Sequence, residues 1–201
     1  MNQKAERKEQ SHGAILASAA RLVRAHGIAG ARVADVMKGA GLTVGGFYAH
    51  FASKEALVDE TLARCGDESQ ARLTARLDEK PAADRAEVVL KRYLSAKHRD
   101  AGTLGCPFPA VVGEIGTTAP EHAGVLEEQV EVLAAGLEEH LRPEGTRAGR
   151  RQLALGLVAL MVGGLSLARA LRGTKLSDDV IEACRALGIA AARRMIKEKK
   201  P

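Results

Sequence analysis

Residues 42–54 of this chain read LTVGGFYAHFASK, and this short segment holds two of the three phenylalanines and one of the two tyrosines. Because the whole chain is only 2% aromatic, the concentration is notable. Phe47 and Phe51 are four positions apart, so on a helix they share one face, whereas Tyr48 and His50 point away from it. A short helix with a bulky inner face and a small, polar outer face is what the major groove of DNA accepts. The alternative is a packing helix that is aromatic by chance.

Charge is distributed unevenly around this segment. The chain has 201 residues, is 46% hydrophobic and 27% charged, and carries a net charge of +5. These values are typical of a soluble globular protein with one large or two small domains. Residues 1–54 contain eight lysines and arginines against three acids, so they account for the whole net charge and the rest of the chain is neutral overall. A basic head on a neutral body favours binding to a polyanion.

The three cysteines, Cys65, Cys106 and Cys184, are far apart and form no C-x-x-C pair. Isolated cysteines in odd number argue against a disulfide framework or a zinc site and favour a reducing cytoplasm. The first ten residues are charged and have no apolar centre, so we expect no signal peptide. Residues 152–168 are uncharged but include three glycines, and they fall short of the roughly 20 apolar residues that cross a bilayer. We interpret them as a buried helix and expect no membrane association.

Nearly every segment has the apolar period of a helix, and none alternates convincingly like a strand, so we expect an all-α protein of about nine helices. Gly27 is expected to end the first helix, Thr43 to cap the third and Ser53 to cap the fourth. Pro107 and Pro109 belong at a helix start or in a loop. From the fourth helix onward the expected ranges are 54–78, 84–100, about 107–116, 120–141, 148–172 and 177–196.

The first three expected helices have the layout of a helix-turn-helix. An amphipathic first helix is followed by a short second helix whose Val33, Val36 and Met37 point inward. The turn at residues 39–41 is Gly-Ala-Gly, whose glycines can take a positive φ. The segment at residues 42–54 then stands where the DNA-reading helix belongs. Three helices packed for structure alone are the alternative. A helical interaction module without DNA binding is a further alternative, but it does not explain the basic N-terminal segment.

With this layout the sequence resembles the TetR family of transcriptional regulators. The resemblance rests on TVGGFYAHF at residues 43–51 and on SKEAL at residues 53–57, and it covers about residues 11–60. Two positions depart from the family pattern. Arg32 stands where a Thr or Ser usually opens the second helix, and Ala49 is smaller than the usual side chain. We therefore expect one phosphate-contacting hydroxyl to be missing and the base-reading surface to be small.

The resemblance implies a sequence-specific DNA-binding transcriptional regulator, a repressor released by a small-molecule or electrophile effector. It implies a helix-turn-helix DNA-binding domain at residues 1–54 and a helical ligand-binding and dimerisation domain at residues 55–201, with no cofactor, metal or enzymatic activity. We expect the arginine and lysine side chains to contact DNA phosphates and the glycines to let the backbone approach the duplex closely. The remaining side chains are expected at the edges of the groove or of the bases. The residues expected at the DNA are Arg32, Thr43, Val44, Gly45, Gly46, Tyr48, His50 and Lys54.

A homodimer is also implied, with a double-stranded DNA operator as the other partner. The sequence supports the dimer, because the expected eighth helix is apolar nearly all round and must be covered on several sides. It contains Gly156, Gly163 and Gly164, small residues that let a neighbouring helix approach closely. We therefore expect the eighth and ninth helices to form the dimer face, with burial inside one subunit as the alternative.

In the family an effector binds among the fourth to eighth helices. The candidate residues for lining such a cavity are Tyr93, Phe108, Glu114, Met161 and Arg169, each of which could equally be ordinary core or surface. Cys106 is a separate candidate, because it stands between Gly105 and Pro107 at the expected start of a helix. There the helix dipole would lower the pKa of its thiol and Gly105 would leave it accessible.

We therefore consider Cys106 as a redox or electrophile switch, as in a subset of the family that senses through a cysteine. An inert buried cysteine is the alternative. A rival function from another class is a thiol-dependent enzyme that pairs Cys106 with His98 or His122, although no local catalytic signature supports it.

Overall fold

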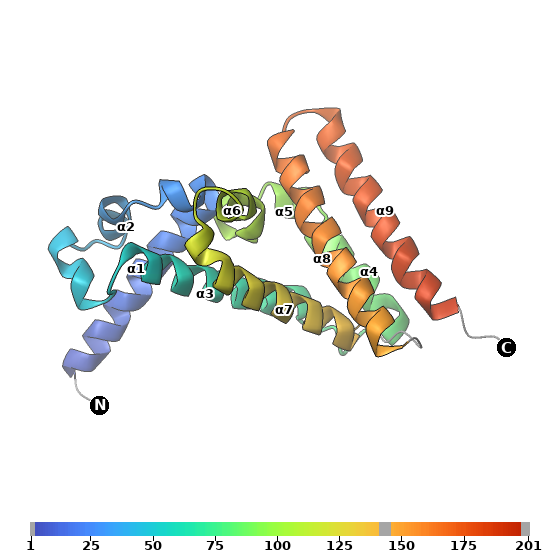
Figure 1. Ribbon diagram of the computed structural model, residues 1–201, viewed down its shortest axis with the longest axis horizontal. Coiled ribbons are helices and arrows are strands. Elements are labelled where there is room, and N and C mark those ends of the chain that lie inside the picture. Colours follow the sequence, from blue (N-terminus) through green and yellow to red (C-terminus); the bar gives the residue numbers. More distant parts are fainter. Residues whose placement is uncertain (1–2, 141–145, 198–201) are drawn as a thin grey trace. The chain divides into compact units, whose positions relative to one another are not determined.

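The structure, a computed structural model, describes residues 3–140 and 146–197, and within these ranges it contains helices and no strand (Figure 1). The predicted all-α fold is confirmed. The elements, with η for a 3-10 helix, are α1 (Gln3–Gly30), α2 (Val33–Gly39), η1 (Val44–Ala49), α3 (Lys54–Thr74), α4 (Ala82–Tyr93), α5 (Ala96–Arg99), η2 (Gly102–Leu104), α6 (Phe108–Ile115), η3 (Pro120–His122), α7 (Ala123–His140), α8 (Arg147–Ala170) and α9 (Lys175–Lys197).

The described chain divides into two compact units, each formed from two separate segments. The first unit comprises the chain up to Asp67 together with Gly102–Glu127, and the second comprises Glu68–Ala101 and the chain from Glu128 onward. The helix-turn-helix therefore shares its unit with α6, although more than fifty residues separate the two in sequence. The functional division into residues 1–54 and 55–201 stays a prediction.

The first unit is built around α1, which packs against α2, η2 and α6, while α2 packs against η1. Side chains from these elements meet in a core where Ile15, Val23, Val36, Met37 and Phe47 are at most 1% exposed. Burial of side chains of this size stabilises a fold by about 1.5–3 kcal/mol each. The inward positions predicted for the second helix are confirmed at Val36 and Met37.

The first helix does not end at Gly27 as predicted. Gly27 breaks the helix with φ 72° and ψ −172°, but helical structure resumes and continues to Gly30. A positive φ suits glycine, which is why the residue type predicted an end here. The helix can continue because the backbone amides freed by the break find a hydrogen-bond acceptor, the Glu114 carboxylate on α6.

Two other predicted helices are shorter in the structure. The helix expected over residues 84–100 is two helices, because Leu94 leaves helical geometry at ψ 76° and Ser95 caps α5 by accepting a hydrogen bond from the His98 amide at 3.2 Å. The helix expected over residues 54–78 ends at Thr74, and Arg76 just beyond it has φ 56°. Both interruptions are set by local capping and backbone geometry that apolar spacing does not reveal.

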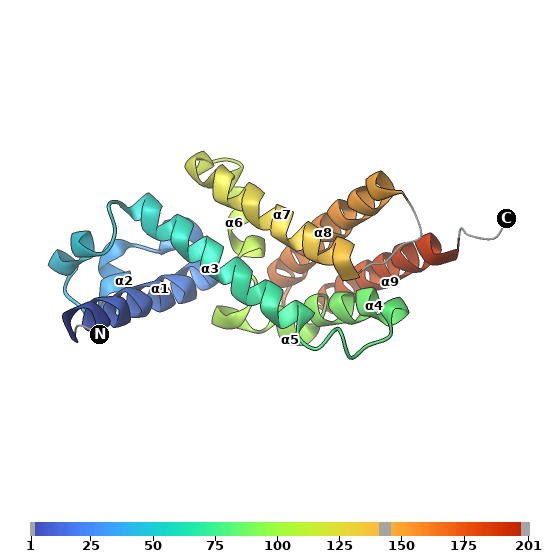
Figure 2. The same cartoon turned by 90° about the horizontal axis from the view of Figure 1, so that it is seen from below.

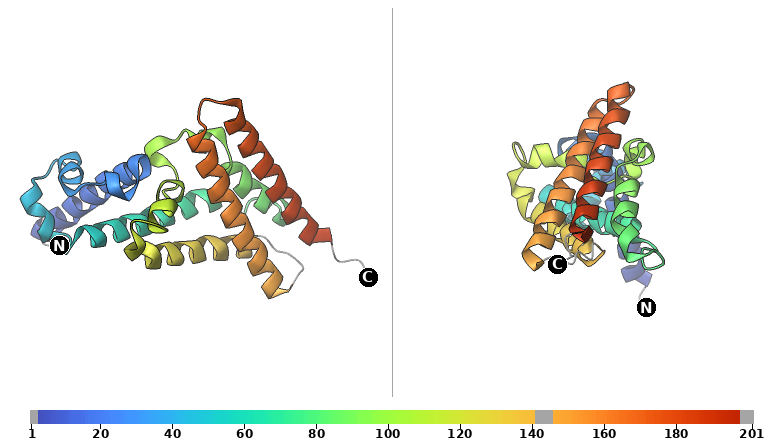
Figure 3. Two further views of the ribbon diagram at one scale, coloured as in Figure 1. Left: turned by 45° about the horizontal axis from the view of Figure 1, so that its top comes forward. Right: turned by 90° about the vertical axis from the view of Figure 1, so that its right-hand side faces the viewer.

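In the second unit α8 and α9 lie side by side as an antiparallel pair, and α4 lies against α9 (Figures 2 and 3). Two glycines permit this packing. A Cβ on Gly164 would stand 2.8 Å from the Cys184 sulfur, and a Cβ on Gly188 would stand 3.1 Å from a methyl of Leu90. By contrast, a Cβ on Gly156 or Gly163 would meet nothing within 4 Å among the described residues. Gly164 thus serves packing within one subunit, and the other two glycines face away from it.

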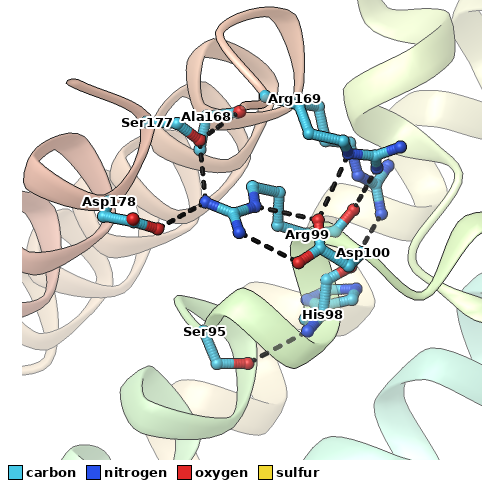
Figure 4. Close-up of polar contacts among 9 residues, drawn as sticks. Ser95, His98, Arg99, Asp100, Ala168, Arg169, Ser177 and Asp178 are labelled. Carbon is cyan, nitrogen blue, oxygen red and sulfur yellow. Dashed lines mark hydrogen bonds and ion pairs between the residues drawn. The ribbon is translucent and has the colours of Figure 1, made fainter. Parts of the chain in front are cut away.

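A polar cluster joins α5 to the turn between α8 and α9 (Figure 4). Arg99 is 11% exposed and donates hydrogen bonds to Asp178 at 2.6 Å, to Ser177 at 2.9 Å and to Asp100 at 2.9 Å. Arg172 donates to the backbone oxygen of Arg99 at 2.6 Å, and Ser177 donates to that of Ala168 at 2.7 Å. These bonds fix the α8–α9 turn to the rest of the second unit.

Candidate nucleic-acid interface

The predicted DNA-reading helix is a six-residue 3-10 helix, η1, rather than an α-helix. Thr43 is its N-terminal flanking residue in extended geometry, but its side chain makes no capping hydrogen bond, so that part of the prediction is wrong. The hydroxyl of Thr43 is exposed instead. Ser53 does cap α3 as predicted, because its Oγ accepts a hydrogen bond from the Ala56 amide at 3.1 Å.

Two aromatic side chains fix η1 to the first unit. Phe47 and Phe51 are 1% and 4% exposed, and their rings stack with centroids 5.7 Å apart. The ring of His12, on α1, stacks on Phe51 at 4.6 Å, and its Nε2 lies 2.6 Å from a carboxylate oxygen of Glu60 on α3. The expectation that the two phenylalanines belong to the core is confirmed. Sequence spacing gave no sign of the contribution of His12, which lies 39 residues before Phe51.

The opposite face of η1 is open to solvent. Tyr48 is 78% exposed and Val44 is 53% exposed. A Cβ on Gly45 would meet nothing within 4 Å, and one on Gly46 would touch only the Met37 methyl at 3.8 Å. Neither glycine has a positive φ, so neither packing nor backbone geometry within the described residues requires glycine here. The absence of side chains at these two positions leaves room only for a partner that approaches this face of η1.

The basic residues around η1 differ in their ion pairing and in their exposure to solvent. Arg32 flanks α2, makes no capping hydrogen bond, and pairs with Asp35 at 2.8 Å on the surface. Lys38 is exposed, and Lys54 is half-buried at the start of α3. An exposed pair such as that of Arg32 is worth at most about 1 kcal/mol, so it can be exchanged for a phosphate.

His50 is only half-buried, and it ends η1. Its Nδ1 is buried and has no hydrogen-bond partner among the described residues. Burial lowers the pKa of His50 below its usual value, and the nearby His12 and Lys8 lower it further. The ring therefore favours the neutral form. Its partial burial leaves less of His50 at the surface than its position in the sequence suggests.

A basic groove that the sequence did not reveal adjoins His50. It has a volume of about 480 Å³ and is lined by Lys4, Ala5, Arg7, Lys8, Ser11 and His50. All of its lining residues other than His50 lie in the first turns of α1, ahead of the apolar stretch that begins at Ile15. The excess of positive charge before residue 54 was the only sequence signal for it.

Glu114 has a role in the structure that differs from cavity lining. Its carboxylate, on α6, accepts hydrogen bonds from the backbone amides of Ile28 at 2.9 Å and Ala29 at 3.0 Å. These are amides freed by the break at Gly27, so Glu114 caps the last turn of α1. No spacing in the sequence connects residues 86 positions apart.

The other effector candidates are divided between the two units. Phe108 and Cys106 belong to the first unit, whereas Tyr93, Met161 and Arg169 belong to the second. Tyr93, Phe108 and Met161 are at most 1% exposed, as ordinary core residues are. Met161 lines a cavity of only about 10 Å³ together with Gln70, Leu73, Thr74, Val89, Leu133, Gly136 and Leu137. This cavity holds a single water at most.

The polar candidates of the second unit contact one another. Arg169 donates to the backbone oxygen of His98 at 3.4 Å (Figure 4). His98 donates from Nδ1 to the backbone oxygen of Tyr93 at 2.8 Å, and the two rings meet edge to face with centroids 4.7 Å apart. Burial lowers the pKa of His98 to about 4, so this ring is neutral at neutral pH.

Cys106 is fully buried, so the predicted accessibility of its thiol is wrong. Pro107 and Phe108 are buried beside it, which a flanking glycine could not reveal. His122, one of the two histidines considered as its catalytic partner, has its Nδ1 2.7 Å from a carboxylate oxygen of Asp59 and is 2% exposed. Within residues 3–140 and 146–197, no three His, Cys, Asp or Glu side chains gather as a metal site requires.

The outer surface of α8 and α9 is apolar and hollowed. A groove of about 410 Å³ is lined by Gly149, Gln152, Leu153, Gly156, Leu157, Leu160, Leu187 and Ala191. Leu187 is 63% exposed, and Leu155 and Leu167 are also exposed. By length and composition α8 could cross a membrane, and only 39% of its most apolar stretch is buried within the described chain. The expectation that this helix is buried within the chain is therefore met only in part.

Comparison with known proteins agrees with this geometry. Residues 15–61 match the family described as "Bacterial regulatory proteins, tetR family". The fold is similar to that of Escherichia coli NemR in its reduced form (TM-score 0.74, 23% identity, 89% of this chain and 94% of that chain). It is also similar to a putative TetR-family regulator from Rhodococcus sp. (TM-score 0.76, 18% identity, 94% of this chain and 100% of that chain). A TetR transcriptional regulator from Chloroflexus aurantiacus is similar too (TM-score 0.76, 24% identity, 96% of this chain and 97% of that chain). No curated protein matches the sequence.

Proposed function

We propose that this chain, whose residues 15–61 match the tetR family of bacterial regulatory proteins, is a cytoplasmic, homodimeric repressor. It binds a DNA operator through two helix-turn-helix heads and leaves it when an effector acts. The observation that carries this proposal is η1: two buried phenylalanines anchor it, while Tyr48 and Val44 stand exposed on its other side. The face of η1 opposite the phenylalanines is therefore free to contact a partner.

In the proposed complex η1 enters the major groove. Thr43, Val44 and Tyr48 contact base edges or groove walls, with Val44 suited to a thymine methyl group. Gly45 and Gly46 let the backbone come close, while Arg32 and Lys54 bind phosphates on either side. His50 contacts the duplex at the edge of the major groove. Because η1 is short and carries Ala49, few bases are read directly, and DNA shape contributes to specificity.

The second copy of the chain covers the outer surface of α8 and α9. This surface has exposed leucines, an apolar groove, and two glycines, Gly156 and Gly163, whose missing side chains leave room for a neighbouring helix. A stable interface needs about 800 Å² from each partner, and two helices of more than twenty residues can supply that area. In this proposal the apolar surface of α8 serves the dimer interface rather than a membrane.

The effector acts by favouring a state in which the heads no longer fit the operator. Glu114 provides a route to the head, because it joins α6 to the end of α1 within the first unit. An effector that draws Glu114 away leaves the Ile28 and Ala29 amides without their acceptor and loosens α1. In the second unit an apolar effector would have to enlarge the small cavity that Met161 lines. Tyr93 and Arg169 belong to the same unit and are further candidates for contacting it.

Cys106 offers an alternative trigger in the first unit. Its thiol is buried beside Phe108 at the start of α6, the helix that carries Glu114. A covalent adduct on this sulfur has no room in the core, so it would displace α6 and weaken the Glu114 cap. The fold is shared with NemR, whose structure is described as a reduced form.

The deciding experiment is selection of bound duplexes from a random pool, followed by affinity measurement on the selected operator. Tyr48→Ala combined with Lys54→Ala should abolish operator binding yet leave the dimer intact by sedimentation. Leu104→Ala with Lys175→Ala is the matched control, since it also removes one large exposed side chain and one exposed lysine. Retained binding by the Tyr48 and Lys54 variant refutes the assignment of the head.

A further inference from the structure

The groove at the start of α1 has no role in the helix-turn-helix layout. We propose that it is a second DNA-contacting site, in which Lys4, Arg7 and Lys8 bind phosphates of the duplex beside the half-site that η1 reads. The proposal rests on the proposed function and extends it to a part of the chain outside the segment that matches the family, which begins at residue 15.

The charges on this part of α1 are sorted by face. On a helix with 3.6 residues per turn, positions 4, 7, 8 and 11 lie on one side, and these are Lys4, Arg7, Lys8 and Ser11. The two acids of the same stretch, Glu6 and Glu9, fall on the opposite side. All three basic side chains are exposed.

The groove continues the face that η1 presents. His50 is one of the residues that line the groove, and it directly follows η1, two positions after the exposed Tyr48. Stacking of His12 on Phe51 and the contact between His12 and Glu60 fix this part of α1 to η1 and α3. The groove and the exposed face of η1 therefore meet at His50, where one duplex could contact both.

The chemistry of the lining selects phosphate over bases. Lysine and arginine on an exposed helix face reach the sugar–phosphate backbone of DNA, which carries a charge at every step whatever the sequence. The groove contains no phenylalanine, tyrosine or leucine that could stack on a base or hold an apolar peptide. The site should therefore add affinity without adding sequence preference, and it should act through counterion release.

The test compares the wild-type dimer with the triple variant Lys4→Ala, Arg7→Ala, Lys8→Ala on the selected operator at several salt concentrations. The slope of log K against log salt should become shallower by about 0.9 for every phosphate that the variant no longer neutralises. Affinity near 0.1 M salt should fall roughly tenfold for each such phosphate, and the ratio of operator to scrambled-duplex affinity should stay unchanged. Ethylation interference should lose signals at phosphates beside the half-site.

The matched control is Lys80→Ala, Lys91→Ala, Lys175→Ala, which removes the same charge from exposed positions of the second unit and should leave the slope at its wild-type value. Alanine favours helix, so the variant in α1 should keep its helix content and thermal midpoint. A wild-type slope and an unchanged interference pattern in the triple variant overturn the proposal, as does an equal decrease of affinity in the control. Failure of the wild type to prefer the operator over a scrambled duplex overturns the proposed function instead.

Discussion

Glu114 occupies the space that a side chain on Gly27 would fill. A Cβ added at residue 27 would stand far closer to a carboxylate oxygen of Glu114 than van der Waals contact allows, and the same carboxylate caps the Ile28 and Ala29 amides. The break in α1, the lack of a side chain at the break and the acidic residue on α6 therefore form one device. The arrangement requires a glycine at residue 27 and a carboxylate at residue 114, and a substitution at either position tests it.

Gly27→Ala should destabilise the protein by more than about 1–2 kcal/mol, because it adds the penalty for a positive φ to a steric conflict with Glu114. Thermal unfolding at fixed protein concentration measures the loss. Gly13→Ala is the control within the same helix. Gly13 has open space around its Cβ position and no positive φ, so alanine there should stabilise by up to about 1 kcal/mol. Equal effects at the two glycines would contradict the prediction.

Glu114→Ala should lower the free energy of unfolding by about 1–3 kcal/mol, because two backbone amides lose a charged acceptor. Glu114→Gln keeps one acceptor oxygen and should lose less. In the double variant Gly27→Ala, Glu114→Ala the two losses should not add, since the steric conflict disappears with the carboxylate. Glu127→Gln, on the exposed surface of α7, is the control. Strict additivity would show that the residues act independently.

Stability should depend on the charge state of His98. Its pKa is lowered from 6.5 to about 4 in the folded protein, so only the unfolded chain takes up this proton between those values. The contribution of His98 is therefore complete above pH 6.5 and is lost as the pH falls toward 4, by at most about 3 kcal/mol. His98→Asn retains a donor for the Tyr93 oxygen and should flatten the difference between pH 7.5 and pH 4.5 in urea unfolding. An identical pH dependence in this variant would count against the assignment.

Operator binding should respond to an electrophile through Cys106 if that residue is the trigger. Gel shifts with and without the electrophile should differ for the wild type and agree for Cys106→Ser. Reaction should be slow, because the thiol is buried and the protein must first open. Cys184→Ser is the control, since burial raises the pKa of that thiol and keeps it a poor nucleophile. If the electrophile still changes operator binding of the Cys106→Ser variant, the proposal that Cys106 is the trigger is refuted.

Leu187→Glu should shift the protein toward monomer in sedimentation, because it places a charge on the wall of the apolar groove of α8 and α9. The expected weakening is about 1–3 kcal/mol per buried charge that stays unpaired. Leu104→Glu alters a similarly exposed leucine, 71% exposed in the first unit, and should leave the dimer unchanged. Dimers of normal stability in Leu187→Glu would place the interface elsewhere.

Local signals in the sequence were sufficient for most of the fold and part of the site. Apolar spacing and small residues identified the helices, the buried Phe47 and Phe51, and the Ser53 cap. The failures share a cause. Gly27 and Cys106 were interpreted from their neighbours in sequence, whereas their conformation and burial depend on partners brought in by α6. No periodicity links Glu114 to Ile28 or His122 to Asp59, because such pairs arise only when distant segments fold together.

The discontinuous first unit has a practical consequence for isolating the DNA-binding part. A fragment that stops at residue 67 would carry the whole helix-turn-helix but would lack α6, which covers α1 with buried Phe108, Val111 and Ile115. The exposed surface and the uncapped end of α1 should make such a fragment unfold or aggregate. An autonomous head would have to include residues 102–127, joined to residue 67 by an engineered linker.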